Sequence, residues 1–184
     1  LGLDFFKRAV ELQQKYKENH RIHNAFQTNG ILIDEAWCKF FKEHNFLIGI
    51  SIDGPAELHD NYRVNRAGRP THAKVMESIA LMKKYGVEFN TLTVVNNENV
   101  KYPEKVYDFL TSIGSTFLQF IPLVERKAAQ VTEDGLQLVN PNYDQEATVT
   151  PWSVPSKEYG EFLNRIFDRW IKKDVGRVFV NIFD

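Results

Sequence analysis

Apolar residues along this chain recur in two alternating periods. The helix period predicts helices over residues 4–16, 34–44, 71–85, 103–113 and 156–170. Runs rich in β-branched and aromatic residues predict strands over residues 22–28, 46–53, 87–95, 116–121 and 177–183. This alternation of helix and strand indicates an α/β fold with a parallel sheet and right-handed crossovers. Residues 122–155 show no sustained period, although residues 135–139 are expected to form a short strand.

The stretch from Phe46 to Pro55 is the most informative of these strands. Successive side chains of a strand point to opposite faces, so the stretch has one face of isoleucines and one of small or polar residues. The two faces are Ile48, Ile50 and Ile52 against Gly49, Ser51 and Asp53. A strand covered by helices on both sides normally carries apolar residues on both faces. We therefore expect the second face to leave room for a ligand.

Polar or turn-forming residues follow four of the predicted strands at the same relative place. They are Asn29-Gly30, Asp53-Gly54, Asn96-Asn97 and Pro122. Ligands of α/β proteins bind at the carboxyl ends of parallel strands. Because parallel strands gather these ends at one edge, the sequence predicts a ligand site there.

Composition and charge narrow the function further. The chain has 184 residues, of which 43% are hydrophobic, and we expect one globular domain over residues 1–184. A formal net charge of −1 gives no reason to expect a nucleic-acid or anionic-membrane partner. No apolar run approaches the ~20 residues of a membrane span. The single cysteine, Cys38, suits a reducing cytoplasmic setting and an inert, packed role.

Short motifs exclude several kinds of site. The chain has no G-x-G-x-x-G and no Walker A sequence, and the H-x-x-H of His20 and His23 is poor grounds for a metal, so no metal ligand is predicted. Ser51 lies in G-x-S-x-D and not in the nucleophile elbow G-x-S-x-G. We therefore expect its hydroxyl to hydrogen-bond a ligand rather than to act as a nucleophile. Arg63 follows the polar strand end and either stays solvated or binds a carboxylate or phosphate. The pair Asp53-Gly54 favours a turn, so a purely turn-forming role is the alternative for Asp53.

A family resemblance goes beyond these patterns. It rests on Gln27-Thr28-Asn29-Gly30, Gly49-Ile50-Ser51-Ile52-Asp53-Gly54-Pro55, His59-Asp60 with Arg63, and Phe117-Leu118-Gln119-Phe120-Ile121-Pro122. In order and spacing these stretches resemble the radical S-adenosylmethionine (SAM) enzymes, and most of all their anaerobic sulfatase-maturating branch, also called arylsulfatase regulators. The resemblance covers nearly the whole chain and implies a partial (β/α) barrel.

The resemblance also implies a chemistry. In such enzymes a [4Fe-4S] cluster, held by C-x-x-x-C-x-x-C, donates an electron to S-adenosylmethionine, and the resulting radical abstracts a hydrogen from the substrate. In this branch a Cys or Ser of a sulfatase becomes Cα-formylglycine. A sulfatase polypeptide and a reductant such as flavodoxin or ferredoxin would be the partners, in the cytoplasm. The sequence does not distinguish a Cys-type from a Ser-type sulfatase.

The family's cluster motif and its G-G-E-P motif have no counterpart in this chain. We therefore expect a barrel truncated at both ends, whose cluster ligands lie outside these 184 residues together with a downstream cysteine-rich domain. The piece alone is expected to be inactive, and to self-associate through unpaired strand edges.

Site roles follow from the resemblance residue by residue. The implied cofactor-binding residues are Ser51, Arg63, Asn29, Leu123 and Val124. Ser51 would bind the ribose or methionine part, Arg63 the carboxylate, and Leu123 or Val124 the adenine. Gln27, Asp53 and Gln119 would bind substrate, and no catalytic residue is expected within the chain.

Other functions stay open at this point. One is a different peptide-modifying radical SAM enzyme, which forms a thioether or carbon–carbon crosslink. Another is a non-enzymatic regulator that binds a sulfatase. A hydrolase or a sugar-binding domain is a further alternative, but the sequence offers no catalytic pair for it.

Overall fold

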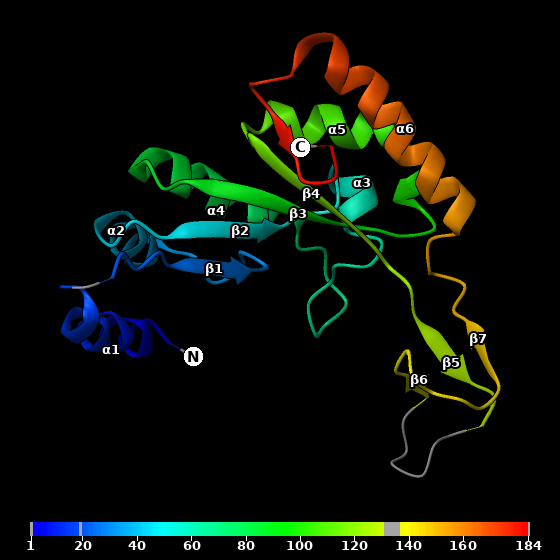
Figure 1. Ribbon diagram of the computed structural model, residues 1–184, viewed down its shortest axis with the longest axis horizontal. Coiled ribbons are helices and arrows are strands. Elements are labelled where there is room, and N and C mark those ends of the chain that lie inside the picture. The colour runs from blue at the N-terminus through cyan, green and yellow to red at the C-terminus, as the bar shows by residue number, and fades with distance from the viewer. Residues whose placement is uncertain (1, 19, 131–136, 184) are drawn as a thin grey trace.

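A five-stranded parallel sheet forms the centre of the computed structural model, which describes residues 2–18, 20–130 and 137–183. The strand order is β1-β2-β3-β4-β8, and every neighbouring pair is parallel (Figure 1). The strands are β1 (Ala25–Thr28), β2 (Leu47–Ser51), β3 (Phe89–Val95), β4 (Phe117–Pro122) and β8 (Phe179–Val180). This order confirms the predicted α/β fold with crossover connections.

Helices cover one face of this sheet. The helices are α1 (Leu3–Gln13), α2 (Glu35–Glu43), α3 (Ala56–His59), α4 (His72–Tyr85), α5 (Pro103–Ser112) and α6 (Ser156–Lys173), with 3₁₀ turns at Gln14–Tyr16 and Asn99–Lys101. Ile48 and Ile50 of β2 are fully buried, and Phe120 of β4 packs edge-on against Phe162 of α6 with ring centroids 5.4 Å apart. Gly49 and Ser51 on the opposite face of β2 are half-buried. The sheet therefore has a covered face and a more open one, as predicted.

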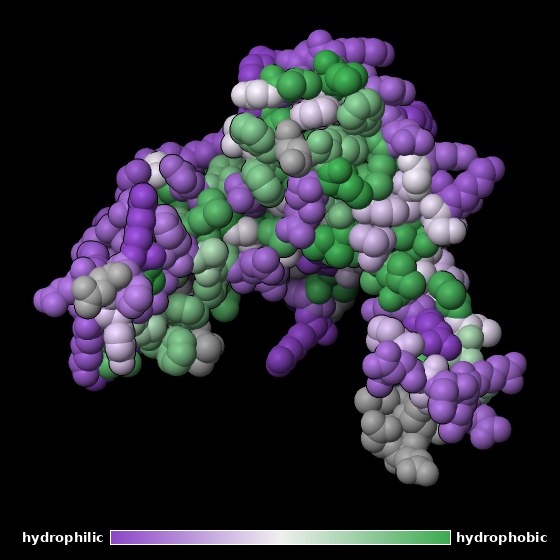
Figure 2. Space-filling model, viewed as in Figure 1, coloured by the Kyte–Doolittle hydropathy of each residue, from purple (hydrophilic) through white to green (hydrophobic). Residues whose placement is uncertain are grey.

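The open face carries apolar as well as polar residues. Figure 2 shows hydrophobic side chains gathered in the middle of the view, with hydrophilic residues along the outer side of α6. Phe117 and Phe179 pair across β4 and β8 and are 38% and 44% exposed. None of the described helices is both long and apolar enough for a membrane span.

The helix ends follow the expected chemistry in part. The Asp34 carboxylate accepts the Trp37 N–H at 3.0 Å and caps α2, and Gly86, with φ 64°, ends α4. Thr71 is the N-cap residue of α4, but its side chain makes no capping hydrogen bond. Asp60 Oδ1 accepts the N–H groups of Thr71 and His72, both at 2.9 Å, so a carboxylate from the preceding loop caps the helix.

Several predicted elements differ in length. The first strand begins at Ala25 rather than residue 22, and the last one spans only Phe179–Val180. Residues 122–155 contain a small antiparallel sheet in the order β6-β5-β7, which extends away from the main sheet (Figure 1). Its strands are β5 (Arg126–Ala128), β6 (Leu138–Val139) and β7 (Ala147–Val149). The strand expected over residues 135–139 matches β6 in part, and its first two residues lie outside the described ones.

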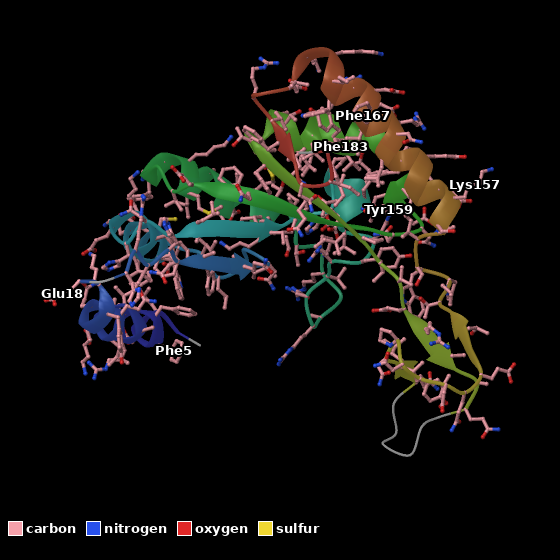
Figure 3. All side chains as sticks on the ribbon, viewed as in Figure 1. Phe5, Glu18, Lys157, Tyr159, Phe167 and Phe183 are labelled. Atoms are coloured by element: carbon pink, nitrogen blue, oxygen red, sulfur yellow. The ribbon has the colours of Figure 1, made fainter. Side chains whose placement is uncertain are left out.

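The buried face of α1 differs from the one its periodicity suggests. Phe5 and Tyr16 follow the helix period, yet they are 53% and 65% exposed, and Figure 3 shows Phe5 at the outer edge of the molecule. Phe6 instead packs edge-on against Phe26 of β1 and Trp37 of α2, with centroids 4.9 and 5.5 Å apart. The aromatic residues of the neighbouring elements, rather than the number of apolar positions on a face, decide how this helix is rotated.

Candidate functional site

The carboxyl ends of β1 to β4 meet at one edge of the sheet. Thr28 aligns with Ile50, Ser51 with Leu92, and Val95 with Pro122. Gln27, Ser51 and Gln119 lie on the open face, because each alternates with a residue of the covered face. The four strand ends singled out from the sequence are therefore brought together, as expected for a site at this edge.

Gly49 does not leave space for a ligand. A Cβ atom at this position would lie 2.6 Å from Leu92 Cδ1 and 3.2 Å from Gln27 Cγ. Side chains of the two neighbouring strands thus fill the space above Gly49. Cross-strand packing thus accounts for a glycine at position 49, and the room for a ligand expected on this face stays a prediction for Ser51 and Asp53.

Asp53 and Arg63 form an ion pair directly after β2. Arg63 donates from Nε to Asp53 Oδ2 at 2.6 Å and from Nη2 to Oδ1 at 3.0 Å. Asp53 is only 3% exposed, and its Oδ1 also accepts the Val94 N–H of β3 at 2.9 Å. The ligand-binding roles predicted for both residues are untested and stay predictions. The pair itself was not predicted. Its partners lie ten residues apart on either side of α3, a short helix that the sequence pattern does not indicate.

His59 and Thr71 complete a closed ring of hydrogen bonds with this pair. The Asp53 N–H donates to His59 Nδ1 at 3.2 Å, and His59 Nε2 lies 3.2 Å from Thr71 Oγ1. The Thr71 hydroxyl donates to the Arg63 carbonyl at 2.6 Å. Since Nδ1 accepts and the Thr71 proton is already used, the imidazole is neutral and carries its proton on Nε2.

This ring makes stability depend on pH. Burial lowers the pKa of His59 from its usual 6.5 to about 4, against the opposing effect of Asp53, and burial also lowers the pKa of His72. The unfolded chain therefore takes up a proton first as the pH falls. The stabilisation is complete above about pH 6.5 and is lost as the pH falls through about 4, and for His59 it is on the order of 3 kcal/mol.

Urea denaturation between pH 7 and pH 4 measures this loss. Carboxylates titrate in the same window, so the comparison is with His59→Gln, which lacks the titrating ring and should lose less stability with falling pH. His20→Gln, at an exposed histidine, is the matched control and should follow the unmodified protein. Equal pH profiles for all three proteins would contradict the assignment of a neutral, buried His59.

Several polar groups at the same edge are unengaged. Among the described residues, no hydrogen bond is made by the Ser51 hydroxyl, the Arg63 Nη1 group or the side-chain amides of Gln27 and Gln119. Asn29 Oδ1 accepts the Ile31 N–H at 3.2 Å and leaves its NH₂ group exposed.

Just beyond β4, Leu123 is half-buried and Val124 is 62% exposed. These residues combine a guanidinium, a hydroxyl, amides and an apolar segment. The set fits a ligand that carries a carboxylate, hydroxyl groups and a flat ring, as S-adenosylmethionine does.

An iron–sulfur cluster does not fit these residues. No group of three His, Cys, Asp or Glu residues that could hold a metal ion occurs within the described part of the chain. Cys38 is fully buried, and burial raises the pKa of its thiol to about 11. A three-cysteine cluster would therefore take its ligands from outside these 184 residues.

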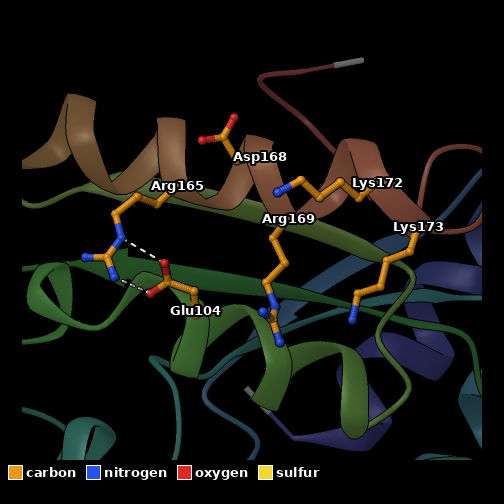
Figure 4. Close-up of a pocket in the computed structure, with 6 residues that line it drawn as sticks. All are labelled: Glu104, Arg165, Asp168, Arg169, Lys172 and Lys173. Carbon is orange, nitrogen blue, oxygen red and sulfur yellow. Dashed lines mark hydrogen bonds and ion pairs between the residues drawn. The ribbon is translucent and has the colours of Figure 1, made fainter.

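A second polar groove lies between α5 and α6, on the outer side of the helix layer (Figure 4). Its lining residues are Glu104, Arg165, Asp168, Arg169, Lys172 and Lys173. Arg165 already pairs with Glu104 through two hydrogen bonds, of 2.8 and 2.7 Å, and Arg169 pairs with Asp108 at 2.6 Å. The arginines of this groove are already paired with carboxylates, so we do not assign the ligand site to it.

Comparison with known proteins identifies relatives of this chain. Residues 1–110 match the family model of the radical SAM superfamily. A serine-type anaerobic sulfatase-maturating enzyme of Bacteroides thetaiotaomicron is 46% identical over 182 residues, which cover 99% of this chain and 44% of that protein. A cysteine-type enzyme of Clostridium perfringens is 38% identical and is covered over 46% of its length. The chain thus spans less than half the length of these curated relatives.

Solved structures agree with this assignment. Native anSMEcpe with bound AdoMet is 37% identical, with a TM-score of 0.82 over 100% of this chain and 46% of that one. The same protein with bound AdoMet and the Cp18Cys peptide matches with the same TM-score of 0.82. Both the sequence and the fold therefore point to one family. The chain belongs to the radical SAM superfamily and, within it, is a relative of the anaerobic sulfatase-maturating enzymes.

Proposed function

We propose that this chain is part of a radical SAM enzyme that oxidises a Cys or Ser of a sulfatase to Cα-formylglycine under anaerobic conditions. The observation that carries the proposal is the edge at the ends of β1 to β4, where Ser51 and Arg63 present unengaged donors. The 46% identity to a serine-type sulfatase-maturating enzyme supports it. In this proposal residues 1–184 form one partial barrel domain.

The residues of this chain bind and orient the cofactor. Arg63, with Nη1 free, binds the carboxylate of S-adenosylmethionine, and Ser51 donates to its ribose or methionine part. Asn29 adds an amide, and Leu123 and Val124 contact the adenine. S-adenosylmethionine, together with a [4Fe-4S] cluster ligated by residues outside this chain, would supply the hydrogen-abstracting chemistry. The protein binds and orients the cofactor and sets the electrostatic field around it.

Substrate and partners follow from the same site. Gln27 and Gln119 on the open face contact the sulfatase polypeptide. Asp53 contributes through Arg63, since its own oxygens are engaged by protein donors. A reductant such as flavodoxin or ferredoxin delivers the electron, in the cytoplasm.

The 184 residues expressed alone self-associate through the edge of β1, which has no described partner strand on its outer side.

Co-expression of the full-length enzyme that contains this chain with a sulfatase peptide tests the proposal. Mass spectrometry of the recovered peptide should show formylglycine: two hydrogens lost from a Ser target, or the same loss with sulfur replaced by oxygen in a Cys target. Peptides with Ala at the target position should stay unmodified. A crosslinked peptide would favour the other peptide-modifying radical enzymes, and binding without any change of mass would favour a non-enzymatic regulator.

Removal of the Ser51 hydroxyl should weaken cofactor binding. Ser51→Ala removes one neutral hydrogen bond to S-adenosylmethionine, so affinity should fall by about 0.5–1.5 kcal/mol with the fold unchanged. Calorimetric titration of the cluster-loaded protein measures this change. Ser112→Ala, at an exposed serine at the end of α5, is the control and should bind as the unmodified protein does. Unchanged affinity in Ser51→Ala would remove Ser51 from the binding site.

A further inference from the structure

His59 lies where the loop after β2 is held at both of its ends. Its Nδ1 accepts the Asp53 N–H at 3.2 Å, at the start of the loop. Its Nε2 donates to Thr71 Oγ1 at 3.2 Å, at the end of the loop. His59 is 1% exposed and Thr71 is 6% exposed, so neither side chain is available to a ligand.

The same ring fixes Arg63 at three points. The Arg63 N–H donates to the His59 carbonyl at 3.0 Å, and the Arg63 carbonyl accepts the Thr71 hydroxyl at 2.6 Å. The guanidinium is held by Asp53 through two further bonds. Thus both the backbone and the side chain of Arg63 are constrained, although the neighbouring residues 64–70 are exposed.

We propose that His59 is a positioning residue which, through Thr71, holds Arg63 in the orientation that binds the carboxylate of S-adenosylmethionine. This inference rests on the ligand role given to Arg63 under the proposed function. A flexible arginine would have to be ordered when the ligand binds, whereas a preformed one has already lost that freedom. Removal of the ring should therefore weaken binding without removing any group that touches the ligand.

The ring requires a neutral imidazole. A proton on Nδ1 would point at the Asp53 N–H, and the new positive charge would compete with Arg63 for the Asp53 carboxylate. The charged and titratable groups around the ring are Asp53, Asp60, Arg63 and His72. Only the Nε2–H tautomer satisfies every bond of the ring.

Two substitutions of Thr71 separate positioning from packing. Thr71→Val keeps the volume but loses the hydroxyl, and the intact, cluster-loaded protein should bind S-adenosylmethionine about 3- to 10-fold more weakly. Thr71→Ser restores the hydroxyl and should restore affinity. Thr91→Val is the matched control, because Thr91 is also buried and its hydroxyl bonds the Ser115 hydroxyl at 3.0 Å. Thr91 lies in the amino-terminal half of β3, away from the loop after β2. Equal affinity in Thr71→Val and Thr91→Val, with both folded, would overturn the proposal.

Combining Thr71→Val with Arg63→Ala distinguishes the positioning role of His59 from the ligand role of Arg63 on which it rests. In Arg63→Ala, Thr71→Val should have no further effect on affinity, whereas a purely structural role would weaken binding in both backgrounds. If Arg63→Ala alone leaves affinity unchanged, the ligand role of Arg63 fails. The ¹⁵N shifts of His59 in histidine-labelled protein then still report the ring: the Nε2–H tautomer is expected, and Thr71→Val should alter its Nε2 signal. The opposite tautomer would refute the ring itself.

Discussion

Arg63→Ala is expected to weaken S-adenosylmethionine binding by about 10- to 150-fold. The variant loses a charge-assisted bond to the cofactor carboxylate, which is worth about 1.5–3 kcal/mol. It also leaves the Asp53 carboxylate, 3% exposed, without its guanidinium partner. Calorimetric titration of the anaerobic, cluster-loaded protein gives the affinity, and urea denaturation of the same samples gives the accompanying loss of stability.

Arg63→Lys separates charge from geometry. Lysine keeps the positive charge but cannot make the two-pronged bond to Asp53 while still offering a donor to the ligand. Its affinity should therefore lie between those of the unmodified protein and Arg63→Ala. Full recovery by lysine would mean that only the charge matters. If Arg63→Ala binds and cleaves S-adenosylmethionine normally, Arg63 has only the role of partner to Asp53.

Asp53→Ala is expected to lower the free energy of unfolding by about 3–5 kcal/mol. One carboxylate accepts two bonds from Arg63 and one from the Val94 N–H, and all three donors lose their acceptor together. Urea denaturation measures the change. Asp53→Asn retains one side-chain oxygen for Val94 and should lose less than the alanine variant.

Asp108→Ala is the matched control. Asp108 also binds an arginine, Arg169, through two hydrogen bonds, but the two side chains are 44% and 37% exposed. Water screens such a pair, so its removal should cost at most about 1 kcal/mol. Equal losses for Asp53→Ala and Asp108→Ala would show that burial does not set the strength of the Asp53 pair.

The succession of helices and strands could be predicted from the sequence because the period of the apolar residues changes at each element. Ile48 and Ile50 alternate as a strand requires, while Val75, Ile79 and Met82 follow the helix period, and all five are buried. Gly86 and Gly114, both with positive φ, mark helix ends that only glycine adopts freely. These signals are local, so they can be read without knowledge of the fold.

The contacts of the site could not be predicted in the same way. Asp53 meets Arg63 only because α3 turns the chain back, and four residues are too few for a periodic signal. Asp60 caps α4 from a loop, and Gly49 is packed by side chains of two other strands. Each of these features depends on residues distant in sequence. The residue types Ser51, Arg63 and Asn29 predict a site at one edge of the sheet, but not which of their groups are engaged by the protein itself.

The bond from Val94 to Asp53 has a consequence for local motion. Val94 belongs to β3, yet its amide hydrogen is held by a carboxylate that lies beyond the end of β2. That amide becomes accessible to solvent when Asp53 moves away, even while the ladder between β2 and β3 stays closed. Opening of the loop is thus a local unfolding event of lower free energy than global unfolding. Hydrogen exchange at the end of β3 is therefore governed by the residues that hold Asp53 rather than by the strand to which Val94 belongs.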